Sequence, residues 1–284
     1  MKFSACRIAA ALVLAAMPAV LSAQWPEHRS SKIPRTADGK PKLDGPTPRT
    51  ADGKPDLSGV WDYAGRIGLP RNFIPGVPNE PPPPKVTEGP SEATFFDVGS
   101  GIPGGLPLTP WAANVLKERK AENSKDNPDA HCLPLGLMQL HTHPQPRKMI
   151  QTPDVTVILY EAQAGIRQIF TDGRKRPPAD VQPWWYGYST GHWEGDTLVV
   201  ETTGFRDDVW LDVFGSPQTN TGKMTERFRR PNYGTLQIDV TIEDPEAYTK
   251  PFTVRVNQKI MPDTELIEFI CTENDRSGSH LVGK

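Results

Sequence analysis

The chain has 284 residues, and its 32 basic and 34 acidic side chains nearly cancel, which gives a formal net charge of −2. This balance, without a basic stripe that alternates with aromatic residues, argues against nucleic acid as a partner. The length is sufficient for one large β domain or for two small domains.

The first 23 residues have the pattern of a secretory signal peptide. Lys2 and Arg7 precede an apolar run that ends at Leu21, and small residues then lead to a cleavage position at about Ala23. This run is too short to cross a bilayer comfortably, and no later run reaches the roughly 20 apolar residues that a transmembrane helix needs. The sequence therefore predicts export to the periplasm or the extracellular space, with no transmembrane segment.

Two cysteines, Cys132 and Cys271, follow the expected cleavage position. In an exported protein, two remaining cysteines most often form a disulfide. The alternative is a catalytic thiol, which needs a nearby base and a depressed pKa, whereas Cys271 lies in an expected hydrophobic strand. We therefore expect a disulfide that joins the segment before the sheet to its last strand.

Residues 24–56 are expected to form a polar N-terminal arm, and residues 57–284 a single β domain. The arm contains a duplication, because the sequence PRTADGKP occurs at residues 34–41 and again at residues 48–55. Two copies are too few for a solenoid, and their Asp-Gly pairs favour turns. Residues 65–108 are rich in proline and glycine and are expected to form a long surface excursion.

One helix is expected, over residues 109–125. Thr109 provides the N-cap and Pro110 occupies the first turn, while Trp111, Val115 and Leu116 share one face. We expect this helix to pack against the outside of the β structure.

The remaining chain indicates an all-β fold, an antiparallel meander of about ten strands whose main sheet spans residues 147–272. Residues 187–205, GYSTGHWEGDTLVVETTGF, form the clearest hairpin, and residues 235–243 show the cleanest alternation of apolar and polar side chains. The other strands are expected at residues 59–63, 148–152, 155–161, 166–171, 224–230, 252–259 and 265–272. Closure into a lipocalin-like barrel would remove the open edges, although a two-sheet sandwich would show the same alternation.

Several motifs resemble a family of exported bacterial proteins that has no assigned activity. They include IFTDGR at residues 169–174, WEGDTLVV at residues 193–200 and TERFRR at residues 225–230. Members of that family commonly carry Gly-His-Pro-His where this chain has GSPQ at residues 215–218, so the resemblance does not imply histidine chemistry in this loop. Separately, Gly59-Val60-Trp61 resembles the lipocalin opening, in which the tryptophan closes one end of the barrel.

The expected binding pocket is the barrel interior, because a barrel of this size is either filled with side chains or holds one small ligand. Tryptophans near the central hairpin could line its rim, and charged strand residues could orient a polar ligand group. The alternatives are plain core packing and ion pairs on the outer face. The candidate ligand-binding residues are Trp61, Trp193, Glu201, Trp210, Asp212, Arg227 and Glu268.

Acid–base chemistry has three candidates in the sequence, His192, Glu201 and Glu268, and for His192 a solvent-exposed hairpin end is the favoured interpretation. His141 and His143 could contribute to a metal site, but a third ligand cannot be named, and histidines between prolines are more often loop residues. No metal or organic cofactor is expected. Trp184, Trp185, Trp193 and Trp210 could form a stacking platform for an aromatic or sugar ligand, and the alternative is plain packing in the core and over the barrel end.

The sequence predicts an exported β-barrel protein that binds a small, largely apolar ligand. One alternative is a cofactor-independent enzyme, namely a hydrolase, lyase or isomerase that uses carboxylate and histidine groups in the same pocket. Another is a cell-surface or carbohydrate-interaction protein that uses the proline-rich segment and exposed tryptophans. The sequence leaves open whether the protein is an enzyme and what its oligomeric state is.

Overall fold

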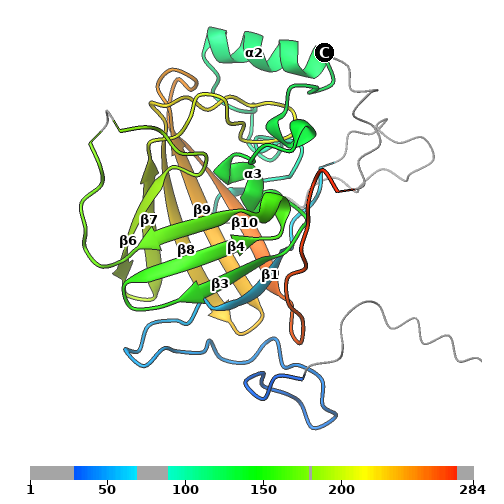
Figure 1. Ribbon diagram of the computed structural model, residues 1–284, viewed down its shortest axis with the longest axis vertical. Helices are drawn as coiled ribbons and strands as arrows, with labels where there is room; N and C mark the ends of the chain where they lie inside the picture. The colour runs from blue at the N-terminus through cyan, green and yellow to red at the C-terminus, as the bar shows by residue number, and fades with distance from the viewer. Residues whose placement is uncertain (1–28, 69–88, 179–180, 274–284) are drawn as a thin grey trace, which may run out of the picture.

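The computed structural model describes residues 29–68, 89–178 and 181–273, and it confirms the all-β fold. Nine strands close into a barrel, and a short tenth strand lies beside it (Figure 1). Within these three ranges, no helix has the length and apolar character needed to cross a membrane. The expected signal peptide lies outside the described residues.

The barrel strands follow one another around the barrel in chain order. They are β1 (Gly59–Tyr63), β3 (Arg147–Gln151), β4 (Val155–Tyr160), β5 (Ile166–Phe170), β6 (Tyr188–Glu194), β7 (Thr197–Thr203), β8 (Lys223–Asn232), β9 (Thr235–Glu243) and β10 (Phe252–Ile260). Pairing of β1 with β10, in which Trp61 lies opposite Ile260, closes the barrel and leaves none of the nine strands as an open edge. All neighbouring pairs are antiparallel except β5 with β6, which run parallel over a two-residue register.

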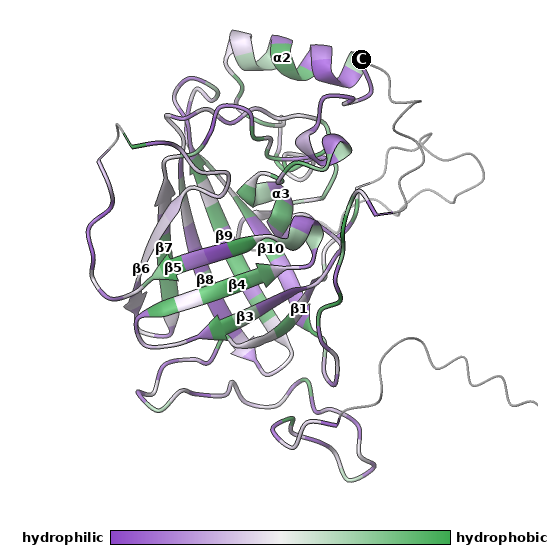
Figure 2. Ribbon diagram, viewed as in Figure 1, coloured by the Kyte–Doolittle hydropathy of each residue, from purple (hydrophilic) through white to green (hydrophobic). Residues whose placement is uncertain are grey.

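Alternation of side chains along the strands decides what the barrel encloses. In β9, for example, Leu236, Ile238, Val240 and Ile242 are buried and the residues between them are half-buried. Figure 2 shows this alternation as green and purple bands along the strands. Because successive side chains of a strand point to opposite faces, a period of two places one apolar row inside the barrel and one polar row outside.

The second half of the expected proline-rich excursion, residues 89–108, is not purely a surface loop. It contains β2 (Ser91–Glu92), which pairs with β10 in parallel, and the side chains of Ala93 and Val98 are fully buried. The first half falls mostly outside the described residues.

The expected helix is present as α2 (Pro110–Ala121), capped by Thr109, whose hydroxyl accepts a hydrogen bond from the Ala112 amide. It lies above the barrel, outside the strands (Figure 1). The expected apolar face is wrong in part, since Ala112 is buried whereas Trp111 is 51% exposed. The helix also ends earlier than expected, because Asn123 has a left-handed φ of 54° that the helix cannot continue through.

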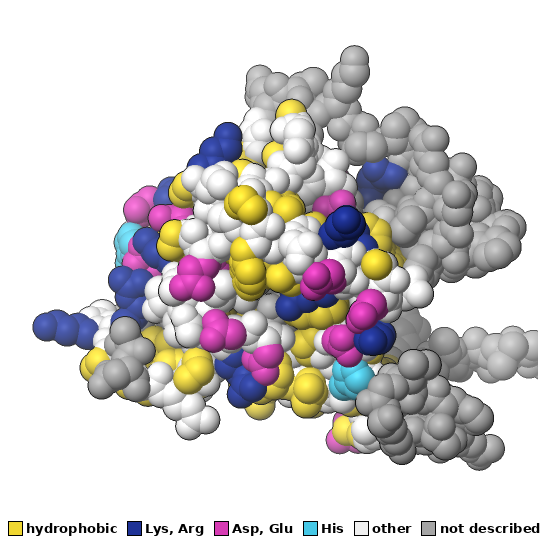
Figure 3. Space-filling model, turned by 90° about the horizontal axis from the view of Figure 1, so that it is seen from above, with side chains coloured by type: hydrophobic (Ala, Val, Ile, Leu, Met, Phe, Trp, Pro, Cys, Tyr) yellow, Lys and Arg dark blue, Asp and Glu magenta, His cyan; other side chains and the backbone are white. Residues whose placement is uncertain are grey.

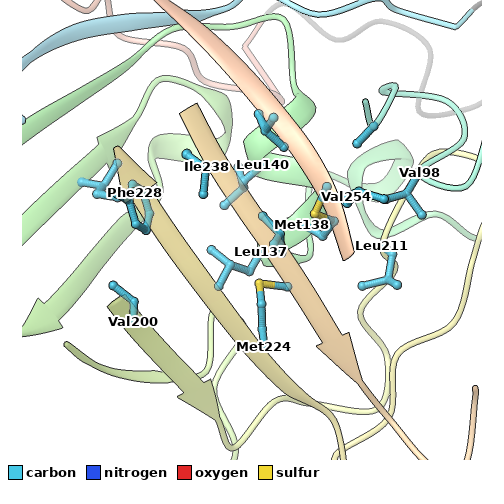
Figure 4. Close-up of a cluster of buried hydrophobic side chains, with 14 of the residues drawn as sticks. Val98, Leu137, Met138, Leu140, Val200, Leu211, Met224, Phe228, Ile238 and Val254 are labelled. Atoms are coloured by element: carbon cyan, nitrogen blue, oxygen red, sulfur yellow. The ribbon is translucent and has the colours of Figure 1, made fainter. Parts of the chain in front are cut away.

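A second helix, α3 (Leu137–Thr142), was not expected, and all six of its residues are buried. Its side chains enter the barrel, where Leu137 and Leu140 lie close to Phe228 and Ile238 (Figure 4). A helix of less than two turns has no readable periodicity and is stabilised by tertiary packing instead of intrinsic propensity.

Arg147 of β3 holds the C-terminal end of α3. Its guanidinium donates hydrogen bonds to the carbonyl oxygens of Leu140, His141, His143 and Gln145, at 2.7 to 3.1 Å. The last carbonyls of a helix have no partner within the helix and carry partial negative charge, so a cation is favourable at this end. Arg147 therefore satisfies the carbonyl groups that insertion of α3 into the barrel removes from water.

The duplicated arm sequence forms the same structure twice, at the base of the barrel, which is the end opposite α2 (Figure 1). In each copy the arginine donates a hydrogen bond to the carbonyl of the glycine four residues later. The same arginine also forms an ion pair with an aspartate outside the arm, Arg35 with Asp263 and Arg49 with Asp196, each at 2.6 Å. Each copy is thus a turn that presents a guanidinium to a carboxylate of the barrel base.

The expected strand at residues 265–272 is wrong. This segment is irregular and mostly exposed, and it is held by a Lys148 ion pair with Glu265 at 2.5 Å and a hydrogen bond from the Ile267 amide to Glu161 at 3.1 Å. The edge of β10 is already taken by β1 at residues 258–260 and by β2 at residues 254–255, which leaves little of it for a further strand.

The disulfide between Cys132 and Cys271 is confirmed, with Cα atoms 5.5 Å apart. It closes a loop of 139 residues in sequence and attaches the segment after β10 to the loop that precedes α3. We expect the double variant Cys132→Ser, Cys271→Ser to lose about 2–4 kcal/mol of unfolding free energy, because the unfolded chain regains loop entropy. Urea denaturation of the variant and of the oxidised parent checks this, and identical midpoints would contradict it.

Candidate functional site

A buried polar cluster lies inside the barrel next to α3. Glu226 of β8, Arg167 of β5 and His141 of α3 are each at most 2% exposed. The Arg167 Nη1 atom donates to Glu226 Oε1 at 2.9 Å and its Nη2 atom donates to Oε2, while His141 Nε2 lies 2.7 Å from Glu226 Oε1. Ser189 and Thr202 accept further hydrogen bonds from Arg167. Five elements thus contribute to one hydrogen-bond network. Such a network is needed because a buried charge pair is tolerated only when its polar atoms are hydrogen-bonded.

The protonation states of the cluster follow from burial and charge. Burial alone would raise the pKa of Glu226, but the charge of Arg167 and the hydrogen bonds from His141 and Arg167 outweigh it and hold this pKa at about 2. Burial lowers the pKa of His141, more than contact with Glu226 raises it. A neutral His141 beside an ionised carboxylate must carry its proton on Nε2, so its Nδ1 atom holds a lone pair.

His141 Nδ1 has no hydrogen-bond partner among the described residues, and neither have the two amide atoms of Gln139 on α3. The Tyr160 hydroxyl lies beside Arg167 in the same region. Burial raises the pKa of Tyr160, although the charges of Arg167 and Arg147 oppose this shift. An unsatisfied polar atom in a dry interior costs about 1–3 kcal/mol, so such atoms mark a place for water or for a ligand group. Chemically, the arrangement offers an imidazole proton acceptor held in one tautomer by a carboxylate. His141 is itself part of α3 and is buried, so a reactant would reach its imidazole only if this helix moved.

A pocket of about 590 Å³ lies at the base of the barrel, and we call it the base pocket. The arm forms one wall, and the ends of β1, β3 and β10 with the turn after β8 form the others. Its apolar residues include Ile33, Pro48, Val60, Met149, Ile150, Ile260, Met261 and Pro262. Its charged residues are Lys32, Asp56, Lys148, Arg230, Asp263 and Glu265. The volume is in the range of about 300–1,000 Å³ that is typical of small-molecule sites.

Arg230 separates the base pocket from the core of the barrel. Its Cζ atom lies 4.8 Å from the ring centroid of Trp61 and 5.0 Å from that of Tyr233, and its guanidinium donates to the carbonyl oxygens of Asp56 and Tyr233. Burial lowers the pKa of Arg230 to about 10, which still leaves it protonated at neutral pH. Trp61, a candidate ligand-binding residue, is completely buried here and donates to the Leu57 carbonyl at 2.9 Å.

The charged strand residues predicted for the pocket do not meet inside the barrel. Glu201 lies on the outer face, where its carboxylate contacts Arg176 and Lys223 at 3.2 and 2.9 Å. Arg227 also lies outside and pairs with Glu194 at 2.8 Å. Glu268 is exposed in the segment after β10. Glu201 and Arg227 thus form ion pairs on the outer face, which was the alternative interpretation of these charges, and Glu268 lies beyond the last strand.

The remaining candidates of the central hairpin lie near its end. The His192 side chain is 63% exposed and lies 3.3 Å from a Glu194 oxygen. Trp193 is half-buried against the core, and the Lys54 ammonium lies 5.9 Å from its ring centroid. Neither side chain is in the buried polar cluster.

Trp210 and Asp212 lie in the loop between β7 and β8, at the end of the barrel that carries α2. Asp212 is fully buried and accepts hydrogen bonds from the amides of Val98, Gly215 and Ser216 at 2.9 to 3.0 Å. Burial raises its pKa to about 6, in spite of these bonds. Asp212 thereby joins two loops. Figure 3 looks onto this end, where hydrophobic side chains and charges of both signs are interspersed.

His141 and His143 diverge although they are two residues apart. His141 enters the barrel, whereas His143 Nδ1 accepts a hydrogen bond from the Gln145 amide and its ring contacts Phe95. In the three described ranges of the chain, no group of three His, Cys, Asp or Glu side chains is placed to hold a metal ion.

Sequence reasoning missed Arg167, Glu226 and Tyr160 as members of one site. A signal existed for the direction of Glu226, because it alternates with Met224 and Phe228, which are apolar and point inward. The partner across the barrel could not be read, since it depends on closure of the sheet.

Comparisons with protein-family models, with curated proteins and with solved structures found no match for this chain. The resemblance to an exported bacterial family therefore stays a prediction.

We expect Glu226→Gln to lower the unfolding free energy by about 3–5 kcal/mol, because it leaves Arg167 buried without a countercharge. The double variant Arg167→Met, Glu226→Leu removes both charges and should be closer to the parent in stability. Arg227→Gln, which breaks an exposed ion pair on the same strand, should cost less than about 1 kcal/mol. Guanidinium denaturation measures all three, and equal losses for Glu226→Gln and Arg227→Gln would contradict the buried pair.

Stability should also fall on mild acidification. Burial, and then the charge of Arg147, lower the pKa of His143 from 6.5 to about 4. Between these values the unfolded state binds more protons than the folded state, so stability is lost as the pH falls from 6.5 towards 4, by about 3 kcal/mol for this one group. The variant His143→Asn should show a shallower loss when urea midpoints are measured from pH 7 to pH 4.5. Parallel curves for parent and variant would refute this assignment.

Proposed function

We propose that the protein is an exported β-barrel protein that binds a small, largely apolar molecule, and that the molecule occupies the base pocket. The observation that carries this proposal is the pocket itself, with a volume of about 590 Å³ and mainly apolar walls. The barrel interior was the expected place, but side chains of α3 occupy it. The disulfide supports the export part of the proposal, since such bonds persist in oxidising compartments.

The charges around the base pocket support an apolar ligand. Lys148 is paired with Glu265, and Asp263 is paired with Arg35 of the arm. Arg230 is directed at backbone carbonyls. Because three of the six lining charges are in ion pairs and the six together sum to zero, the walls offer a ligand apolar area and hydrogen bonds more than a net charge.

The arm supports a pocket that is formed before the ligand arrives. Its two arginine turns are tied to Asp263 and Asp196, at two separate points of the barrel base. A wall that is ordered in advance reduces the conformational entropy lost on binding.

A second candidate function is a cofactor-independent enzyme that uses the buried polar cluster. The observation that favours it is the neutral His141 imidazole, oriented by Glu226 and with a free Nδ1 lone pair. Turnover of an ester or lactone panel that is lost in His141→Gln and kept when the base pocket is filled would support this reading over the first.

Filling the base pocket should abolish ligand retention. Ile150 is 42% exposed on the outer face of β3 and lines the pocket, whereas Ile166 is 61% exposed on the outer face of β5 and does not. We expect native mass spectrometry of protein purified from periplasm to show a bound small molecule in the parent and in Ile166→Trp, but not in Ile150→Trp. Thermal shifts with a lipid and aromatic panel should follow the same order. No retained molecule and no shift in the parent would sink the proposal.

A further inference from the structure

Three aromatic side chains form a patch on the outside of the barrel where β5 and β6 meet. Phe170, Trp184 and Tyr188 make up this aromatic patch, with ring centroids 5.3 Å apart between Phe170 and Tyr188 and 5.5 Å apart between Trp184 and Tyr188. Trp184 is 37% exposed, and the other two rings are half-buried. None of the three lines the base pocket.

The position of Trp184 is set by its backbone and by a glycine. Its amide donates to the Gly204 carbonyl at 2.9 Å. A Cβ atom at Gly204 would lie 3.2 Å from the indole ring, and the φ of Gly204 is 73°, so a side chain there would be both crowded and strained. The indole therefore packs against the Gly204 backbone and contacts the Tyr188 ring. Trp184 is a fixed aromatic surface that keeps more than a third of its area in solvent.

Charged groups with fixed geometry surround the aromatic patch. Asp172 binds the Arg174 guanidinium at 2.6 to 3.0 Å, and this guanidinium lies 3.8 Å above the Phe170 ring. The hydrogen bonds that Arg174 donates to Asp172, and its contact with the Tyr188 hydroxyl, raise the pKa of Arg174 above its ordinary value. At this end of the patch, the planar Arg174 guanidinium, a hydrogen-bond donor, is therefore stacked on the Phe170 ring.

Glu201 supplies an acceptor on the neighbouring strand. It lies opposite Thr190 of β6, and Thr190 in turn pairs with Phe170 of β5. Its carboxylate is held by Arg176 and Lys223 on the outer face. The charges around the patch are then Arg174, Arg176 and Lys223 against Asp172 and Glu201, which nearly cancel.

We propose that the aromatic patch is a saccharide-binding site that accepts a pyranose unit of a neutral or weakly acidic polysaccharide. A pyranose ring has an apolar C–H face that stacks on an aromatic ring, and a rim of hydroxyl groups that donate and accept hydrogen bonds. Trp184 and Tyr188 supply the stacking surface, while Glu201, Arg174 and Arg176 supply acceptors and donors beside it. The near cancellation of charge disfavours a densely charged polymer.

A purely structural role for the patch would be to cover the short parallel seam between β5 and β6. Phe170 and Tyr188 suffice for that role, since they are the residues of these two strands that face each other outside the barrel. Trp184 lies before β6 and adds exposed aromatic area to the surface. The saccharide proposal therefore depends on Trp184, and a substitution of this residue separates the two roles.

Affinity electrophoresis tests the proposal, with gels that contain hydroxyethyl cellulose, xylan, pullulan or alginate. We expect at least one of these polymers to retard the parent protein and Trp184→Ala to lose about tenfold in affinity. Glu201→Gln should weaken retardation, because it replaces a charged acceptor by a weaker neutral one. The matched control is Trp111→Ala, which removes a tryptophan that is 51% exposed on α2 and should leave retardation unchanged.

Three outcomes would overturn the proposal. These are no retardation by any of the four polymers, an equal loss in Trp184→Ala and Trp111→Ala, and retardation by alginate alone that disappears at high salt. Circular dichroism melts of each variant establish that the barrel is intact before affinities are compared. The aromatic patch and the base pocket share no residue. A negative result in this experiment therefore does not count against binding of a small molecule in the base pocket.

Discussion

A buried ion pair, Arg167 with Glu226, is the interaction on which the interior of this barrel depends. The low pKa of Glu226 follows from it, whereas His141 stays neutral because its burial outweighs contact with Glu226. Two charges in an apolar interior are tolerated only when their hydrogen bonds are satisfied, and here Ser189, Thr202 and His141 complete them. His141 is part of α3, so the same network that neutralises the pair also positions a helix inside the barrel.

Occupation of the interior by α3 changes where a ligand can be accommodated. A barrel of this size has one interior, and here a chain segment with six buried residues uses part of it. The two sites that we propose for binding therefore lie on the outside of the barrel, at its base and along the β5 and β6 seam. Both surfaces are built from fixed parts, the base pocket from an arm tied by two arginine turns and the aromatic patch from an indole resting on Gly204.

Much of the fold was readable because β-strands carry a local signal. The alternation in β9, the turn between β6 and β7, and the cap of α2 each depend on a few adjacent residues. The expected strand at residues 265–272 also has apolar residues, but strand formation needs a partner edge, and β1 and β2 already occupy that of β10. The candidate site was harder to read. Glu226, Arg167 and His141 are up to 85 residues apart in sequence, and Glu226 looked like one charge among several on β8.

The sequence by itself determined the all-β class, the position of nearly every strand, the capped helix and the cysteine pair, because propensity, period and capping act over short distances. The tertiary structure decided which charges lie inside. A one-residue change of direction moves a side chain from the outer surface to the core, so Glu226 is buried while its neighbour Arg227 is in solvent. It also decided that α3 enters the barrel and that the arm closes a pocket at the base. Those contacts join residues far apart in the chain, and their energies exist only once the barrel has closed.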